Sequence, residues 1–473
     1  MSKLETLKSC TTKQALASLL GIKTRFLTHT LYVLRPETQY YQFKIAKKNG
    51  GERVISAPSE KLKLIQSKLS HLLLDCIDEF GPATLPSHMH KKKLGLAHGF
   101  VRDRSIITNA MMHLNKRFVL NIDLDNFFDS FNFGRVRGFF IKNRQFQLDP
   151  NIATLIAQIA CYDNKLPQGS PCSPVISNLI CHPLDIRLAS LAEKYSCTYS
   201  RYADDITFST RKSVFPPQIM HEDDEQYTAG KTLSSNIERA GFSINAAKTR
   251  IQYKDSRQDV TGLIANKKPN TKKEYWRTAR IQCRFLFKTG YFTKNIDGNF
   301  VQGNINELEG QLNFIDQVDR YNRLRQHPSL NPVYALRKEN QKFKKHSKVY
   351  LTGRERTLSQ FLYYRLFYAN EKPTVLCEGK TDNIHLKSAI NQLAATYTRL
   401  ATPKTLSSDY ELLMRFVAYN ERTKFLLELS GGVDYLKGFI EMFPKQYEFY
   451  RAPTPQNLVV IVLDNDKGPD GLL

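Results

Sequence analysis

Two adjacent carboxylates inside a strand-like segment place the strongest constraint on what this chain can fold into. Residues 198–209 are largely apolar or aromatic on both sides of Asp204-Asp205, which follow Tyr202 and Ala203. Like charges at a strand–turn–strand tip repel each other and raise each other's pKa, which is costly unless a cation neutralises them. The tetrapeptide therefore predicts a hairpin that binds a divalent cation or, as the alternative, a polar turn at the surface.

A third carboxylate favours the cation. Asp123 ends a mostly apolar run, residues 118–122, with the length and composition of a buried strand. Two Mg²⁺ ions about 4 Å apart can clamp the attacking and leaving oxygens of a phosphoryl transfer. Few protein ligands suffice, because Mg²⁺ keeps several of its waters. We therefore expect a nucleotidyl-transfer site formed by Asp123, Asp204 and Asp205.

Two further segments complete an ordered set. The turn-rich segment 166–174 contains Gln168 and opens a helix near Pro174, so that its backbone can approach a nucleotide closely. Residues 241–245 and Lys248 follow the acidic pair. In this order the segments resemble the successive palm motifs of reverse transcriptases, over about residues 40–265.

The resemblance implies roles for individual residues. Asp123, Asp204 and Asp205 would be the ligands of two Mg²⁺ ions, and Lys248 would donate a proton to the leaving pyrophosphate. Arg53, Phe128 and Gln168 would contact the incoming dNTP, with the Phe128 ring excluding a 2′-hydroxyl. Considered alone, Phe128 also fits a core position, and Lys248 a solvated surface lysine.

Two short signatures narrow the family. Asn109 and His113 match an Asn-Ala-x-x-His signature, and Val260-Thr261-Gly262 match a Val-Thr-Gly signature of bacterial retron reverse transcriptases. The resemblance implies a cognate structured noncoding RNA that serves as primer, through an internal 2′-hydroxyl, and as template for branched RNA–DNA. At a spacing of four residues Asn109 and His113 share a helical face. They would bind RNA or, as the alternative, satisfy each other in the interior.

The charge balance points to a polyanionic partner. The chain of 473 residues has 69 Lys and Arg against 45 Asp and Glu, a net charge of +24. Such an excess destabilises a compact fold unless a polyanion binds, and nucleic acid is the usual one. No apolar run approaches the roughly 20 residues of a membrane span, so we expect no membrane partner. The eight cysteines lack a Cys-x-x-Cys pair, and we expect reduced thiols in a cytoplasmic protein.

Residues 267–288 are locally basic, with eight Lys and Arg against one acid. There we expect RNA or hybrid contacts from the cations and core packing from the interleaved aromatic residues. The predicted RNA-binding cations are Lys267, Lys268, Lys272, Lys273, Arg277, Arg280, Arg284 and Lys288. A second basic stretch, 337–356, would extend that surface or form a solvated linker.

The C-terminal part has a different pattern. Residues 374–377 and 458–463 read as buried strands of a parallel sheet, followed by acids at their carboxyl ends, where sites collect. This pattern resembles a Toprim domain, and the resemblance implies Glu378, Asp464 and Asp466 as Mg²⁺ ligands of a nuclease effector in antiphage defence. The interval between Glu378 and the aspartates is long and the sequence ends at Leu473, so we expect an incomplete or degenerate domain.

The expected fold is an α/β multidomain protein, a right-hand fingers–palm–thumb polymerase followed by a Toprim-like α/β domain. We expect fingers and palm in 1–265, a helical basic thumb in 266–335, a basic linker in 336–372 and the Toprim-like domain in 373–473. A further expected partner is a second copy of the chain, in a homo-oligomer assembled with the RNA–DNA. The rival functions are a reverse transcriptase outside the retrons, an RNA-dependent RNA polymerase, and an RNA-binding scaffold with a vestigial polymerase site.

Overall fold

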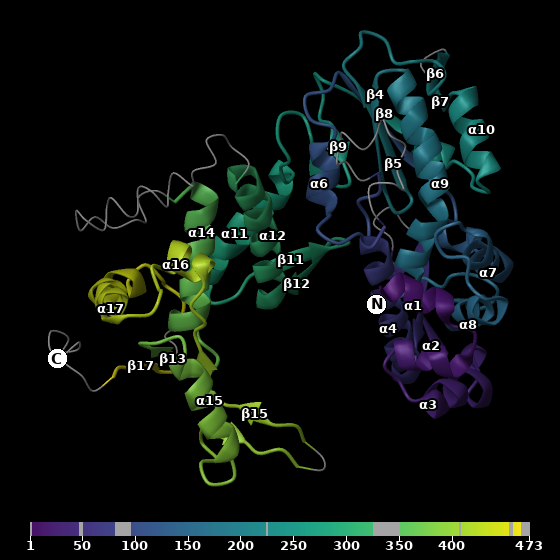
Figure 1. Ribbon diagram of the computed structural model, residues 1–473. Helices are drawn as coiled ribbons and strands as arrows, with labels where there is room; N and C mark the ends of the chain where they lie inside the picture. Colours follow the sequence, from purple (N-terminus) through teal and green to yellow (C-terminus); the bar gives the residue numbers. More distant parts are fainter. Residues whose placement is uncertain are drawn as a thin grey trace. The chain divides into compact units, whose positions relative to one another are not determined.

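The computed structural model describes residues 2–46, 51–80, 96–223, 226–324, 351–405, 408–453 and 457–464. The chain divides into two compact units, residues 1–270 and 271–473 (Figure 1). Asp466 and residues 337–350 of the second basic stretch lie outside the described residues. Among the residues described, no helix combines the length and the apolar character that crossing a membrane demands.

A four-stranded antiparallel sheet forms the centre of the first unit. Its strands are β3 (Phe118–Asp123), β4 (Cys197–Tyr202), β5 (Asp205–Thr210) and β8 (Arg250–Tyr253), in the order β4-β5-β3-β8. The two strands predicted around residues 118–124 and 200–209 are confirmed as β3 and the β4–β5 hairpin. The predicted helix near Pro174 is α9 (Ser173–Lys194), which packs on β4.

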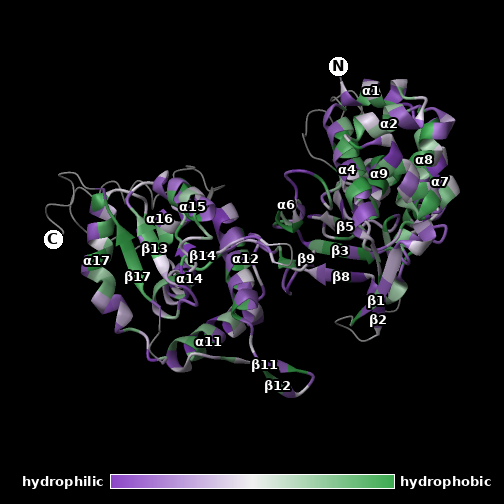
Figure 2. Cartoon of the chain, turned by 90° about the horizontal axis from the view of Figure 1, so that it is seen from below, coloured by the Kyte–Doolittle hydropathy of each residue, from purple (hydrophilic) through white to green (hydrophobic). Residues whose placement is uncertain are grey.

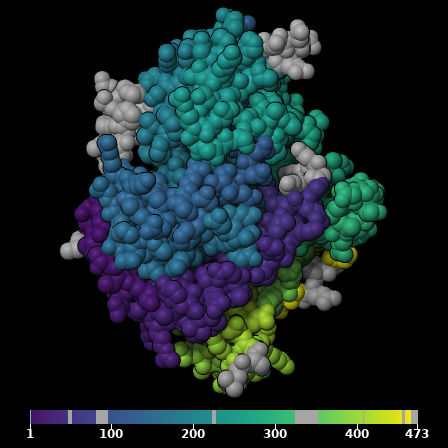
Figure 3. Space-filling view, turned by 90° about the vertical axis from the view of Figure 1, so that its right-hand side faces the viewer, coloured from purple at the N-terminus to yellow at the C-terminus, as the bar shows by residue number. Residues whose placement is uncertain are grey.

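Helices pack around this sheet and share its core. In α4 the apolar residues Leu62, Ile65 and Leu69 recur at helical spacing and are fully buried. The purple N-terminal helices lie directly against the blue segment that includes α7 and α8 (Figure 3). The helices that pack around the sheet of the first unit, besides α9, are α1 (Lys3–Ser9), α2 (Lys13–Leu19), α3 (Thr24–Thr28), α4 (Glu60–Asp78), α6 (Ile106–Met111), α7 (Phe133–Lys142), α8 (Pro150–Ala160) and α10 (Lys231–Arg239).

The remaining elements of this unit are short. β1 (Tyr40–Ala46) and β2 (Glu52–Pro58) pair antiparallel and form a hairpin within the predicted fingers. The others are η1 (His29–Val33), η2 (Pro36–Thr38), η4 (Phe128–Ser130), β6 (Met220–Asp223), β7 (Gln226–Ala229), η5 (Ala246–Lys248), β9 (Asp259–Val260) and β10 (Leu263–Ile264).

The second unit begins with two long helices and an intervening hairpin. These are α11 (Lys273–Thr289), β11 (Thr293–Ile296), β12 (Asn299–Gln302) and α12 (Ile305–Leu324). They are followed by α14 (Gly353–Tyr363), η7 (Tyr364–Tyr368), β13 (Thr374–Cys377), α15 (Asp382–Gln392), β14 (Ala401–Thr402), β15 (Glu411–Leu412), β16 (Arg415–Phe416), α16 (Glu421–Leu427), α17 (Val433–Tyr447) and β17 (Val459–Val462).

The predicted parallel sheet is confirmed in this unit, but the predicted burial of its second strand is not, because Val460 and Val462 in β17 are exposed. Its order is β16-β13-β17, and β13 pairs parallel with both neighbours. All four residues of β13 are buried, as the central strand of a sheet covered on both faces should be. The hydrophobic character of β13 and β17 is visible in Figure 2.

The expected separation of thumb, linker and Toprim-like domain is not what the structure shows. In α11 the ring of Phe287 packs 5.5 Å from that of Tyr364 and 5.3 Å from that of Tyr450. The described part of the predicted linker, 351–372, forms α14 and η7, and Phe361 and Phe367 are buried in the same core. The polar residues of this stretch hid its helical apolar face, so one hydrophobic core joins segments that we expected to be separate.

Candidate active site

The three predicted carboxylates lie at adjacent strand ends in the first unit. β3 and β5 pair antiparallel with Asp123 directly opposite Asp205. Only Ala203 and Asp204 connect β4 to β5, and Ala203 has the left-handed φ of +57°. The amide of Leu124 donates to the carbonyl of Asp204 over 3.1 Å, which ties the end of β3 to the turn. The structure therefore brings Asp123, Asp204 and Asp205 together at one tip.

The carboxylates interact electrostatically. Desolvation, followed by the charges of Asp204 and Asp123, raises the pKa of Asp205 to about 6. Desolvation is also the main cause that raises the pKa of Asp204, while Lys248 and Arg53 act in the opposite direction. Asp205 keeps access to solvent, so its desolvation is partial. The cluster is thus a group of mutually repelling acids that a cation from solvent would stabilise.

The chemistry of this donor set fits Mg²⁺. In the described residues no three Asp, Glu, His or Cys side chains already converge around one point, so the acids form no closed cage. Mg²⁺ prefers hard carboxylate oxygens, is bound through one or two of them, and completes its octahedron with waters and substrate phosphates. Carboxylates at an open tip suit that mode of binding better than an enclosed all-protein site.

Lys248 lies beside Asp123. Its Nζ donates to Asp123 Oδ1 over 2.8 Å, and this bond raises the pKa of Lys248. Asn245 caps η5 and donates from Nδ2 to Asp125 over 2.7 Å, which fixes this segment to the residues after β3. The Lys248 side chain is 55% exposed and protonated, so it is free to turn toward a bound nucleotide. Its role as a proton donor stays a prediction.

A close backbone approach places the predicted nucleotide-binding loop on the fingers hairpin. Gly169 has φ +126°, and a Cβ there would lie 2.6 Å from the carbonyl oxygen of Ser56. The amide of Ser56 donates to the carbonyl of Gln168 over 2.8 Å. These contacts fix the loop to β2, the strand that carries the exposed Arg53. The Gln168 and Phe128 side chains are half-buried, and their contact with a nucleotide stays a prediction.

A buried ion pair beneath the turn was missed from the sequence. Arg201 is fully buried in β4, and its Nε and Nη2 donate to the two carboxylate oxygens of Asp185 on α9, each over 2.7 Å. Its Nη1 donates to the carbonyl of Ala203 over 3.0 Å and to Asn178 over 3.1 Å. A Cβ on Gly99 would lie 2.8 Å from the amide nitrogen of Ala203. An arginine inside the strand predicted within residues 198–209 was the available signal, because a buried arginine requires an acidic partner.

The two retron signatures meet behind the same hairpin. Asn109 and His113 are 0% exposed, and their hydrogen bonds are internal. His113 bonds to Ser200 on β4 and to Ser209 on β5, each over 2.7 Å. Asn109 Nδ2 donates to the hydroxyl of Thr261 in the Val-Thr-Gly signature over 3.4 Å. This placement does not support the expectation that Asn109 and His113 contact RNA, and it agrees with the interior alternative.

The direction of these hydrogen bonds follows from proton counting. The Ser200 hydroxyl donates its one proton to Asn109 Oδ1 over 2.6 Å, so it must accept from His113 Nε2–H. Burial lowers the pKa of His113 to about 3, so the imidazole is neutral and carries one proton. With that proton on Nε2, Nδ1 is left as the acceptor for the Ser209 hydroxyl. A neutral side chain thus links the two strands that carry the acidic turn.

The predicted RNA-binding cations fall in two places. Lys267 and Lys268 are exposed at the end of the first unit, and Lys272 precedes α11. The other five occupy one face of α11, because their spacing of three or four residues matches the helical period. All five are exposed, and in the described part of the chain none forms a salt bridge. They are Lys273, Arg277, Arg280, Arg284 and Lys288, and we call them the α11 stripe.

In the second unit two of the predicted Toprim acids are neighbours. Glu378 directly follows β13, and its Oε2 accepts a hydrogen bond from the amide of Asp464, which follows β17, over 3.1 Å. Both therefore lie at the carboxyl ends of adjacent parallel strands. Asp382, at the start of α15, accepts from the amide of Gly379 over 2.6 Å and closes the turn after Glu378.

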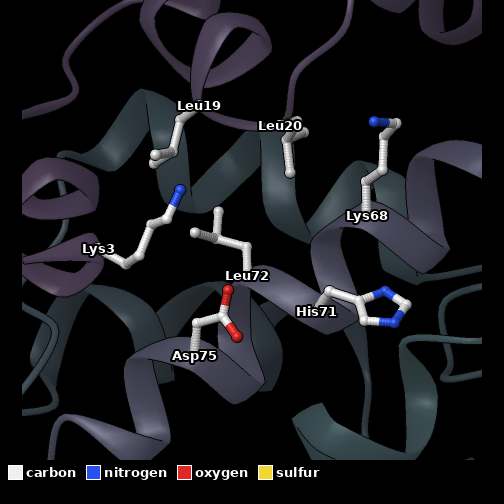
Figure 4. A pocket seen from close by; sticks show the side chains of 7 residues that line it. All are labelled: Lys3, Leu19, Leu20, Lys68, His71, Leu72 and Asp75. Atoms are coloured by element: carbon white, nitrogen blue, oxygen red, sulfur yellow. The ribbon is translucent and has the colours of Figure 1, made fainter.

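An open pocket of about 300 Å³ lies among α1, α2 and α4 (Figure 4). None of the predicted site residues lines it, so we assign it no part in the polymerase site. Its lining residues are Lys3, Leu19, Leu20, Lys68, His71, Leu72 and Asp75.

Comparisons with known proteins agree with the geometry of the first unit. Residues 45–273 match the family model described as reverse transcriptase (RNA-dependent DNA polymerase). The retron Ec86 reverse transcriptase of Escherichia coli is 32% identical over 63% of this chain and 82% of that protein. The retron Mx162 and Mx65 reverse transcriptases of Myxococcus xanthus are 33% and 32% identical, each over 54% of this chain.

The coverage of these relatives is partial. This chain spans 53% of the length of the Mx162 protein and 58% of the Mx65 protein, a little over half of each. Among solved structures, a telomerase of Candida tropicalis in complex with a telomeric RNA fragment is 12% identical. The superposition covers 60% of this chain and 53% of the telomerase chain. Its TM-score is 0.34, so we base no conclusion on it.

The neutral state of His113 predicts a pH-dependent stability. In the unfolded chain the pKa of the His113 imidazole returns to its ordinary value of 6.5. The unfolded chain therefore binds a proton below that pH, whereas the folded chain binds it only near pH 3. The contribution of His113 to the free energy of unfolding is therefore fully present above pH 6.5. It falls by about 1.4 kcal/mol per pH unit as the pH decreases from the unfolded pKa toward the folded pKa. In His113→Gln this part of the slope disappears, as urea titrations between about pH 6 and about pH 4 would measure. His221→Gln, at an exposed histidine, is the control, and an unchanged slope in His113→Gln would contradict the assignment.

Proposed function

This chain belongs to the retron reverse transcriptase family, and from that premise we propose that it is an RNA-directed DNA polymerase with Asp123, Asp204 and Asp205 as its catalytic acids. The observation that carries the proposal is the register of β3 and β5, which sets Asp123 opposite Asp205 beside Asp204. This juxtaposition lies inside the matched segment 45–273.

The residues at the tip divide the work of nucleotide addition. Asp123, Asp204 and Asp205 would hold Mg²⁺, which when bound activates the attacking hydroxyl and neutralises charge on the transferred phosphoryl group. Arg53, whose charge partly opposes the rise in the pKa of Asp204 that desolvation causes, would bind the triphosphate. Lys248 would pass a proton to the leaving pyrophosphate once it releases Asp123.

Two other side chains would select the nucleotide. Gln168 sits on the loop that Gly169 fixes against β2, and its backbone would lie close to an incoming dNTP. Phe128 stands five residues after Asp123, where a bulky ring would exclude a 2′-hydroxyl. Selection of deoxynucleotides separates this proposal from an RNA-dependent RNA polymerase.

For primer and template we propose a cognate structured noncoding RNA. In this mode an internal 2′-hydroxyl of the RNA starts DNA synthesis and the product is branched RNA–DNA. Family membership supports this mode, and the net charge of +24 supports a large polyanionic partner. The α11 stripe and the exposed Lys267 and Lys268 would bind its phosphates. Arginine and lysine on a helix face position nucleic acid without reading its sequence.

A second activity is proposed for the C-terminal unit. The adjacency of Glu378 and Asp464 at the ends of β13 and β17 supports a Toprim-like Mg²⁺ site. Carboxylates at the carboxyl ends of parallel strands are where such α/β sites form. We propose that Asp466 joins them and that the unit is a nuclease effector restrained by the RNA–DNA assembly during antiphage defence.

Removing the acids at the tip should abolish DNA synthesis. Asp204→Asn/Asp205→Asn is expected to lower dNTP incorporation on a generic RNA template with an annealed primer by about 10³-fold or more, because several kcal/mol of transition-state stabilisation is lost. The control is Asp163→Asn, since Asp163 is exposed with φ +49°, a conformation that asparagine adopts readily. Activity that persists in the double variant, or a wild-type preference for NTPs over dNTPs, would refute the assignment.

The nuclease proposal is tested with protein freed of its RNA–DNA. In the presence of Mg²⁺ it should cleave tRNA, other RNA or DNA, and Glu378→Gln should slow cleavage by about 10²- to 10³-fold while leaving dNTP incorporation intact. Glu441→Gln, at an exposed position of α17, is the matched control. Absence of cleavage by the freed wild-type protein, or equal cleavage by Glu378→Gln, would refute the proposed nuclease site.

A further inference from the structure

The β11–β12 hairpin is firmly rooted but exposed at its tip. Phe292, at its base, is 3% exposed, and its carbonyl accepts from the amide of Gly303 over 2.7 Å. A Cβ on Gly303 would lie 1.9 Å from the Phe292 ring, so glycine is required there. Asp297 and Gly298 form the turn with φ +50° and +88°, as a tight two-residue hairpin loop demands. In Figures 1 and 2 the hairpin extends outward from the second unit.

The tip presents an aromatic ring among hydrogen-bonding side chains. Phe300 is 76% exposed, the largest exposed fraction among the exposed large apolar side chains of the described residues. It pairs with Asn295, and the next pair on the same face of the hairpin is Thr293 with Gln302. All four side chains are exposed. An isolated two-stranded hairpin is only marginally stable in water. A binding partner that covers a large ring exposed on such a hairpin would therefore stabilise it.

Charge indicates the class of that partner. The hairpin follows α11 after three residues, 290–292, and α11 carries the stripe of five exposed cations without salt bridges in the described part of the chain. Phe285, also exposed at 55%, lies next to the stripe on the same helix. Cations that bind phosphates, interleaved with rings that stack on bases, are the usual composition of a surface for single-stranded nucleic acid. A protein partner would leave the stripe uncompensated.

We propose that Phe300 stacks on an unpaired base of the RNA partner, while the α11 stripe binds the adjoining phosphates. Gln302, on the same face, provides an amide donor and an acceptor for the edge of that base. Asn295 Oδ1 accepts from the amide of Gly298 over 2.9 Å, so Asn295 offers its Nδ2 as a donor. The hairpin thereby distinguishes a single-stranded segment from a duplex, in which bases are stacked on one another and closed to a side chain. This inference rests on the proposed function for the existence of an RNA partner, but not on catalysis.

The test measures binding without synthesis. In fluorescence anisotropy with a labelled single-stranded RNA of mixed sequence, Phe300→Ala should weaken binding by about 5- to 100-fold, as loss of one base–aromatic stack implies. Phe300→Trp should retain affinity, and binding of a fully paired RNA duplex should be nearly unchanged by Phe300→Ala. The matched control is Ile296→Ala, which truncates an exposed side chain on the opposite face of the hairpin.

Ionic strength separates stacking from phosphate contact. Arg280→Ala should lower the slope of log affinity against log salt by about 1, whereas Phe300→Ala should leave the slope unchanged. Equal affinity of Phe300→Ala and wild type for the single strand would overturn the proposal. Loss of self-association in Phe300→Ala with unchanged RNA binding would overturn it in favour of an interface between copies. Primed-template synthesis, assayed in parallel, reports on the polymerase assignment separately, because Phe300 lies outside the catalytic tip.

Discussion

The acidic turn depends on the buried ion pair between Arg201 and Asp185. Both charges are removed from water, with side-chain exposures of 0% and 2%, and such burial costs about as much as the pairing returns. The ion pair is therefore better explained by its effect on the position of the turn than by a contribution to the stability of the fold. The third guanidinium nitrogen holds the carbonyl of Ala203, whose left-handed φ an alanine adopts only at a cost. Without that anchor on α9, the carbonyl of Ala203 would lose its side-chain hydrogen bond, leaving the hydrogen bond from the amide of Leu124 to the carbonyl of Asp204 to hold the turn.

The rear of the hairpin is held by a second, uncharged network. His113 bonds one serine on each strand, and Asn109 continues the chain to Thr261, so two signatures that are about 150 residues apart in sequence brace the same sheet. The front of the hairpin carries carboxylates that repel one another. A rigid polar scaffold behind an electrostatically strained tip is an arrangement that keeps acids ready for cations before substrate arrives.

Local pattern in the sequence was enough to predict the strands β3, β4 and β5, the parallel strands β13 and β17, and the three acids, because each is a run or a motif. What it missed was long-range. The sequence shows that Asn109 and His113 are polar but not that they are buried, so RNA contact was an equally open interpretation. It gives no pairing of Arg201 with Asp185, sixteen residues earlier. The apolar face of α14 was masked by its charged residues, and the β11–β12 hairpin lies between two helical patterns that dominated the segment.

We propose that this chain builds DNA on its own structured RNA through the acids at the β4–β5 tip. The most direct measurement is co-expression with the noncoding RNA encoded beside its gene, followed by isolation of DNA and treatment with ribonuclease. The account predicts a discrete branched DNA that keeps a short RNA stub and that is absent with Asp204→Asn/Asp205→Asn. Absence of any branched product from wild-type protein, while the same protein extends a generic primed template, would contradict the retron mode of synthesis.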